Sequence, residues 1–138
     1  GGLGYEVTAE HIAMQMAVCC NAQLTLLHVI PPIELDYPTT RVVGKNWQHL
    51  VDTDTPQGRS LRQALDVSHE LGLSVNVNVR QGNVMGEILD EIKSGDYDLL
   101  CMGSPYSGHA LRQFYAPNIT AEIAEVSICP VLSARYKK

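Results

Sequence analysis

An apolar segment, Tyr97–Met102, leads into Gly103 and Ser104, and a second apolar segment starts after Cys129-Pro130. The first pattern predicts a buried strand, and Pro130 forces extended backbone before the last strand. Between the two strands lie a loop that extends to Asn118 and a stretch with helical periodicity. A strand, a loop, a helix and a second strand form a unit of a parallel sheet, and such sheets place ligands at the carboxyl ends of their strands.

The rest of the chain repeats this alternation of helices and strands. Helices are expected over 8–20, 55–71, 83–94 and 118–126, and strands over 23–30, 73–80, 97–102 and 131–134. Residues 31–54 form a long connection, which is either a variable surface loop or a cover over a binding site. The alternation indicates right-handed βαβ units and therefore an α/β fold with a mainly parallel, doubly wound sheet and helices on both faces.

The predicted helix boundaries rest on capping residues. Thr8, Thr55 and Asn83 can each accept a hydrogen bond from an amide in the first turn, and Pro56 fits the first helical position. Gly72 can adopt the left-handed conformation that ends a helix. Apolar spacing predicts the core-facing residues of three helices: Ile12, Met16 and Cys19; Met85, Ile88, Leu89 and Ile92; Ile119, Ile123 and Val126.

Two strands differ in their pattern. The segment 23–30 is almost continuously apolar, which predicts a strand covered on both faces. In the segment 73–80, valines at 75, 77 and 79 alternate with Asn76, Asn78 and Arg80. That alternation predicts one face in solvent and a place at the edge of the sheet.

Composition narrows the range of functions. The 138 residues fit one domain, 1–138, and a formal net charge of −5 argues against nucleic acid as a partner. No apolar run is long enough to cross a bilayer and no signal peptide is visible, so no direct membrane insertion is expected. The four cysteines lack metal-ligand spacing, so no metal site is predicted. They indicate free thiols in a reducing cytoplasm, with a redox-sensing pair at Cys19-Cys20 as the alternative.

Four segments in order make the chain resemble the universal stress protein family. They are Ala22–Val29, the turn Gln81-Gly82-Asn83, Asp96–Ser104 and Cys129–Leu132. The resemblance implies a five-stranded parallel sheet in the order 3-2-1-4-5 and a homodimer formed by pairing the last strands, through Val131, Leu132, Ser133 and Ala134.

We expect the first strand of that family to be absent here, because Gly1-Gly2 falls where the turn after it is expected. Using Leu3–Val7 as the strand leaves no room for that turn. Without the strand, the sheet would have a gap of two inter-strand spacings, roughly 10 Å. We therefore expect that the chain is truncated at this strand, that preceding residues are omitted, or that a strand is supplied from elsewhere.

The family's nucleotide loop is also altered here. In members that bind ATP, a first glycine is followed after two residues by a second and after nine more by Gly-Ser or Gly-Thr. Gly103 matches the first glycine. The position of the second glycine is taken by Tyr106 or Ser107, or by Gly108 if the loop holds one extra residue, and the position of the final pair is taken by Pro117-Asn118. The family's Asp near the ribose falls at Gly1. Because proline has no amide hydrogen to offer a phosphate, weak or no ATP binding is expected.

The resemblance predicts that the chain is a non-catalytic regulatory stress-response domain that homodimerises. The alternative is a sensor of an adenine nucleotide, such as ATP, AMP or a cyclic dinucleotide, which could be the cytosolic tail of a membrane transporter or dock on one. Its ligand would contact Val29, Ile30, Gly82, Met102, Gly103, Ser104, Ser107, Gly108, His109, Arg112, Asn118 and Ile119. An enzyme is not expected, because His109 is the only histidine of the loop and no carboxylate stands near it in sequence.

Overall fold

A computed structural model describes residues 4–30, 50–104 and 119–135. Its elements alternate between helix and strand, as predicted for an α/β fold. In chain order they are α1 (Gly4–Cys20), β1 (Leu24–Ile30), α4 (Pro56–Glu70), β2 (Val75–Gln81), α5 (Val84–Ser94), β3 (Leu100–Ser104), α7 (Ile119–Val126) and β4 (Val131–Arg135). Most of the expected connection 31–54 and most of the loop 103–118 lie outside the described residues.

The strands form two separate parallel pairs. β1 pairs with β2 from Leu24 opposite Val75 to the end of both strands, and β3 pairs with β4 from Leu100 opposite Val131. Among the described residues, no strand joins β1 to β3. The five-stranded order 3-2-1-4-5 therefore stays a prediction, of which the pairings 3-2 and 4-5 are observed.

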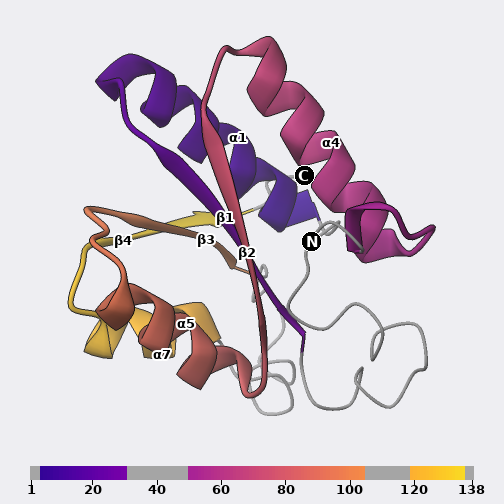
Figure 1. The fold of residues 1–138 in the computed structure, drawn as a ribbon. Helices are drawn as coiled ribbons and strands as arrows, with labels where there is room; N and C mark the ends of the chain where they lie inside the picture. The colour runs from indigo at the N-terminus through magenta and orange to yellow at the C-terminus, as the bar shows by residue number, and fades with distance from the viewer. Residues whose placement is uncertain (1–3, 31–49, 105–118, 136–138) are drawn as a thin grey trace.

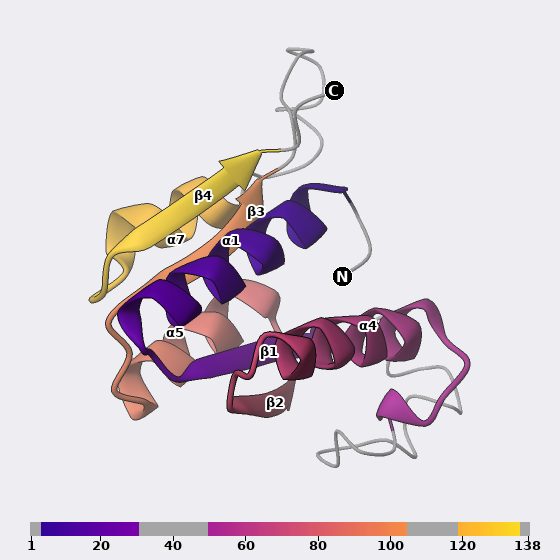
Figure 2. The same ribbon diagram turned by 90° about the horizontal axis from the view of Figure 1, so that it is seen from above.

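Helices cover both sides of the strands, as Figure 1 shows. α1 and α4 lie on one side, and α5 and α7 lie on the other. α1 packs mainly against β3 and β4 and makes fewer contacts with β1, so it spans both pairs (Figure 2). The result is a layered α/β arrangement in which helices, rather than a continuous ladder of hydrogen bonds, connect the two pairs.

Two apolar clusters form the core. The cluster under α4 centres on Leu50, Leu61 and Val77. The second, which we call the α5/α7 cluster, centres on Ile88, Ile92, Ile123 and Cys129. It also takes in side chains from both pairs of strands, namely Leu27, Val29, Leu100, Met102 and Val131. Burial of this shared apolar surface therefore holds the two pairs together.

The strand β1 contacts both clusters, as its apolar sequence predicts. Leu26 packs against the cluster under α4, whereas Leu27 and Val29 pack against the α5/α7 cluster. Successive side chains of a strand point to opposite faces, which explains the division. Ile30 is fully buried, at 1% exposure, and the six residues before it are half-buried.

The first helix differs from its prediction. α1 begins at Gly4, so Thr8 lies inside the helix and does not cap it. Residues 4–7 are helical and do not form the alternative first strand. The predicted inward face is also wrong: Met16 is 36% exposed and Cys19 is exposed, while Ala9, Met14 and Ala17 are buried. Apolar residues occur on all sides of α1, so packing against β3 and β4 selects which face is buried. The small alanines on that face allow the helix to lie close to the strands.

The caps of α4 and α5 are confirmed. The Thr55 side chain accepts a hydrogen bond from the Gly58 amide at 3.0 Å, and Asn83 accepts one from the Gly86 amide at 3.0 Å. Gly72 has φ +74°, and after it the Leu73 amide donates to the Ser68 carbonyl oxygen at 3.0 Å. The cap predicted at Asn118 lies outside the described residues.

The predicted bounds of the last elements need two corrections. β3 begins at Leu100, three residues after Tyr97, and continues through Gly103 to Ser104, because pairing with β4 extends the ladder to Arg135. Val126 is 55% exposed instead of core-facing, because it is the last residue of α7 and lies beyond the α5/α7 cluster. Ile123, at 0% exposure, and Ile119 pack as predicted.

Candidate functional site

Gly82, in the turn between β2 and α5, links the carboxyl end of β2 to that of β1. Its amide donates to the Ile30 carbonyl oxygen at 3.0 Å. Gly82 has φ +144°, and a Cβ there would lie 2.7 Å from Oε1 of Glu87. The backbone conformation therefore favours glycine, and the Glu87 side chain lies close to the place of a Cβ. Ile30 and Gly82, which were predicted as ligand contacts, are adjacent in the structure.

The carboxyl end of β3 is fixed to the start of α7. The Thr120 hydroxyl donates to the Gly103 carbonyl oxygen at 2.9 Å, and Thr120 is only 4% exposed. Gly103 itself lies opposite Ala134 of β4. Thr120 was not among the predicted ligand residues, although a hydroxyl in the first turn of a helix is a signal that could have found it.

The predicted ligand-binding residues fall into three groups. Ile30, Gly82 and Gly103 lie at the carboxyl ends of the strands. Val29, Met102 and Ile119 pack against the α5/α7 cluster, so their side chains contribute to the core. The remaining predicted contacts, Ser107, Gly108, His109, Arg112 and Asn118, lie outside the described residues, and so does the side chain of Ser104. Their roles stay predictions.

Two helices that begin beside the carboxyl ends of strands, α5 and α7, carry an acidic residue in the first turn. Glu87 occupies this place in α5, which follows β2, and Glu122 occupies it in α7, which is fixed to β3. The amino end of a helix carries a partial positive charge that favours anions. A carboxylate there stabilises the helix but repels a phosphate that approaches the same amides.

A polar network covers the face of β2 that was predicted to be in solvent. Arg80 donates from Nε to Glu91 at 2.9 Å and from a terminal nitrogen to Glu87 at 3.0 Å. Asn78 donates to the other oxygen of Glu91 at 3.2 Å, and the Tyr97 hydroxyl donates to that oxygen at 2.6 Å. Only Asn76 of the three polar residues is exposed, so the prediction of a solvent face is wrong.

The network shifts the pKa of three groups. Burial raises the pKa of Glu91, but hydrogen bonds from Tyr97, Arg80 and Asn78 outweigh it and hold the pKa below its usual value. Hydrogen bonds to Glu91 and Glu87 raise the pKa of Arg80. Burial, followed by the hydrogen bond to Glu91, raises the pKa of Tyr97. The spacing of Glu87 and Glu91, one helical turn apart, was the signal that could have predicted this network.

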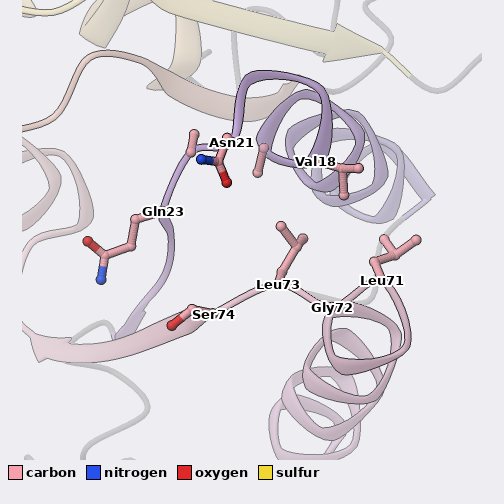
Figure 3. Close-up of a pocket in the computed structure, with 9 residues that line it drawn as sticks. Val18, Asn21, Gln23, Leu71, Gly72, Leu73 and Ser74 are labelled. Atoms are coloured by element: carbon pink, nitrogen blue, oxygen red, sulfur yellow. The ribbon is translucent and has the colours of Figure 1, made fainter.

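A concavity of about 400 Å³ lies at the opposite ends of the strands, where β1 and β2 begin (Figure 3). Residues 17, 18 and 21–23, at the end of α1, line one side, and residues 71–74, after α4, line the other. None of the predicted ligand residues belongs to it.

The model of one protein family, the universal stress protein family, matches residues 6–135 of this chain. The chain belongs to the universal stress protein family. The match spans every described strand and the four predicted sequence segments that carried the resemblance.

Solved structures of universal stress proteins share the fold. One in complex with cAMP has a TM-score of 0.66 and 23% identity, with 96% of this chain and 90% of that chain covered. UspA from Lactobacillus plantarum has a TM-score of 0.65 and 20% identity, with 93% and 88% covered. A family protein from Arabidopsis thaliana with AMP bound has a TM-score of 0.54 and 17% identity, with 92% and 78% covered. No curated protein sequence matches the chain.

Within the described residues, no helix combines the length and the apolar character that crossing a membrane requires.

Proposed function

We propose that this chain is a non-catalytic regulatory domain of the universal stress protein type, with weak or no ATP binding. The observation that carries the proposal is the pair of carboxylates, Glu87 and Glu122, in the first turns of α5 and α7. These two helices begin where phosphates of a nucleotide would approach, at the carboxyl ends of β2 and β3. Each carboxylate adds negative charge at its helix end, and at Glu87 the ion pair with Arg80 offsets part of that charge.

The cation on β2 gives further support. Arg80 lies next to the carboxyl end of the strand, but both Glu87 and Glu91 accept hydrogen bonds from it. A guanidinium that is paired in this way is not available for a phosphate unless both ion pairs break. The sequence adds Pro117-Asn118, which stands where ATP-binding members have a glycine and a hydroxyl residue.

The environment of Glu91 supports a non-catalytic role. A general base must reach a substrate proton, and its pKa works best near the operating pH. Glu91 instead receives hydrogen bonds from Arg80, Asn78 and Tyr97, and its pKa is lowered. It therefore serves the packing of α5 against β2.

A second candidate is the binding of an adenine nucleotide with fewer phosphates, such as AMP or a cyclic nucleotide. Two structural relatives, one in complex with cAMP and one with AMP bound, favour it. A single phosphate needs fewer amides than a triphosphate, so loss of the family's glycines weakens it less. Ile30, Gly82 and Gly103 would then border the base and ribose.

Calorimetric titration with ATP, AMP, cAMP and a cyclic dinucleotide separates the two candidates. We expect no ATP binding below millimolar concentration. Tight ATP binding would contradict the proposal, whereas selective AMP or cyclic nucleotide binding would establish the second candidate. The double change Pro117→Gly/Asn118→Ser restores the family's residues, and a gain in ATP affinity would show that the rest of the site is intact.

We also propose that the chain forms a homodimer through β4, residues Val131, Leu132, Ser133 and Ala134. Among the described strands, β4 pairs only with β3, so its other edge has no strand partner there. Two apolar side chains just before β4 are exposed, Val126 at 55% and Ile128 at 71%. An open edge beside exposed apolar surface favours association with a second copy. The predicted attachment to a membrane transporter stays a prediction.

Analytical ultracentrifugation tests the dimer. If β4 pairs with its own copy about a two-fold axis, residues near its centre face each other, and Ser133→Arg brings like charges together. We expect a dimer for the unmodified chain and for Gln63→Arg on the exposed surface of α4, and a monomer for Ser133→Arg. A monomer in every case would contradict the proposal.

A further inference from the structure

The concavity at the start of β1 and β2 lies where two helices end. α1 ends at Cys20 and α4 ends at Glu70, and the concavity is lined by the last turn of α1 and by the two segments that follow these helices. The carboxyl end of a helix carries a partial negative charge of roughly half a unit. Two such ends beside one concavity favour a positive charge within it.

The lining has no charged side chain that would balance this negative potential. All nine residues that line the concavity are uncharged. The last turn of α1 carries no basic residue, and the single basic residue in the last turn of α4, His69, does not line the concavity. The formal net charge of −5 adds a field that attracts cations to the molecule as a whole. An anionic ligand is therefore disfavoured here.

One wall of the concavity is apolar. Val18 is 47% exposed and Leu71 is 44% exposed, and Figure 3 shows both near Leu73. Large apolar side chains that share an exposed hollow can bury the body of a ligand. This wall favours a ligand with an aliphatic part.

The other wall is polar. Asn21, Gln23 and Ser74 line it, and Figure 3 shows the amide of Asn21 directed into the hollow. Asn21 has φ +53°, a conformation that asparagine tolerates better than most residues. Amide and hydroxyl oxygens can accept hydrogen bonds from an ammonium group without bringing a charge that would need burial.

We propose that this concavity binds a small organic cation, an ammonium group carried on an aliphatic body. The body lies against Val18, Leu71 and Leu73, and the ammonium lies toward Asn21 and the two helix ends. A volume of about 400 Å³ is within the range of small-molecule sites. The site is at the end of the strands opposite the proposed nucleotide site, so this inference does not depend on the proposed function.

The test is a nuclear magnetic resonance titration of the full chain with n-hexylammonium, 1-hexanol and hexanoate, which share an aliphatic body and differ in charge. We expect saturable shifts in the backbone amides of residues 21–23 and 71–74 with hexylammonium. Binding of 1-hexanol should be at least about tenfold weaker, and hexanoate should not bind. Equal affinities for hexylammonium and 1-hexanol, or no saturable shift with hexylammonium, would overturn the proposal.

Two variants test where the ligand binds. Ser74→Lys adds a positive charge at an exposed lining residue and should weaken hexylammonium binding at least about tenfold. Gln63→Lys adds the same charge at an exposed position of α4 that does not line the concavity. This variant should change the affinity for hexylammonium less than about twofold. Equal losses in the two variants would show a general charge effect and overturn the assignment.

A third variant tests the polar wall. Asn21→Gly keeps a residue that accepts positive φ and removes the amide, so we expect an unchanged melting temperature and about two- to fivefold weaker binding. An unchanged affinity would contradict the role of Asn21.

Discussion

The side chain of Arg80 on β2 donates a hydrogen bond from Nε to Oε1 of Glu91 on α5, across 2.9 Å. The pair is mostly shielded from water, with side-chain exposures of 27% and 12%. Asn78 and Tyr97 donate hydrogen bonds to the other carboxylate oxygen of Glu91. The network therefore joins β2, α5 and the segment before β3, and it turns a polar strand face into an interface between layers.

Replacing Glu91 tests this network. Because the pKa of Glu91 is lowered in the folded chain, its ionised form stabilises the fold above the unfolded-state pKa, near 4.3, and that contribution is lost as the pH falls through the folded value. We expect Glu91→Gln to lower the free energy of unfolding by about 2 kcal/mol at pH 7 and to reduce its decline below pH ~4.3. Urea unfolding between pH 7 and 3 measures both, with the exposed Glu125→Gln as control. Parallel acid profiles in the two variants would contradict the prediction.

Tyr97 should affect how the free energy of unfolding changes at alkaline pH. Its pKa is raised in the folded chain, so its contribution is complete below the unfolded value, near 10, and is lost as the pH rises toward the folded value. We expect Tyr97→Phe to cost about 1 kcal/mol at pH 7 and to flatten the loss of stability above pH ~10. Chemical unfolding at pH 8 to 11 checks this. An unchanged alkaline slope in Tyr97→Phe would assign the slope to other groups.

Ile123 is the most buried apolar side chain of the α5/α7 cluster, at 0% exposure. Ile123→Ala should lower the free energy of unfolding by about 2–5 kcal/mol, because it removes buried methyl groups and leaves a cavity in the α5/α7 cluster. Val126→Ala, three residues later on the same helix, should cost less than about 0.5 kcal/mol because Val126 is 55% exposed. Equal costs would show that α7 does not pack as described.

Two glycines should respond differently to alanine. At Gly58 a Cβ would lie 2.5 Å from the carbonyl oxygens of Leu50 and Thr53, so the backbone must shift. At Gly72 no atom lies within 4 Å, and the cost comes from φ +74° alone, about 1 kcal/mol. We expect Gly58→Ala to cost at least about 2 kcal/mol, although alanine favours a helix. Thermal unfolding of the two variants gives the comparison, and the reverse order would contradict it.

Glu122 provides a direct test of the charge argument at the nucleotide site. Glu122→Gln removes a carboxylate from the first turn of α7 and should raise AMP or ATP affinity about two- to fivefold. Glu125→Gln, one turn further from the helix start, removes the same charge and should change the affinity less. If the two changes raise affinity equally, net charge and not the helix end would be responsible.

The sequence predicted the class of fold and several local features because they depend on neighbouring residues. Thr55, Pro56 and Gly72 define the ends of α4, and Asn83 defines the start of α5, through hydrogen bonds that span only a few residues. The stripe of Ile88 and Ile92 is similarly local, since one helix has one dominant apolar face. The ligand residues were assigned by resemblance and stay predictions, since most of their loop lies outside the described residues.

Other features depended on contacts between distant segments. The inward face of α1 could not be read from its sequence, because apolar residues occur on all its sides and contact with β3 and β4 selects Ala9, Met14 and Ala17. The polar face of β2 is covered because α5 offers Glu87 and Glu91 to Arg80. The concavity exists because α1 and α4 end on the same side of β1 and β2, which tertiary packing alone determines.

By itself, then, the sequence determined an α/β chain of alternating elements with capped helices, since capping and periodicity act over one or two turns. Tertiary structure decided the rest: which helix faces are buried, how the two parallel pairs share the α5/α7 cluster, and which charges are paired. Those outcomes depend on contacts between surfaces that are far apart in the chain. Burial contributes its free energy only once those surfaces are in contact.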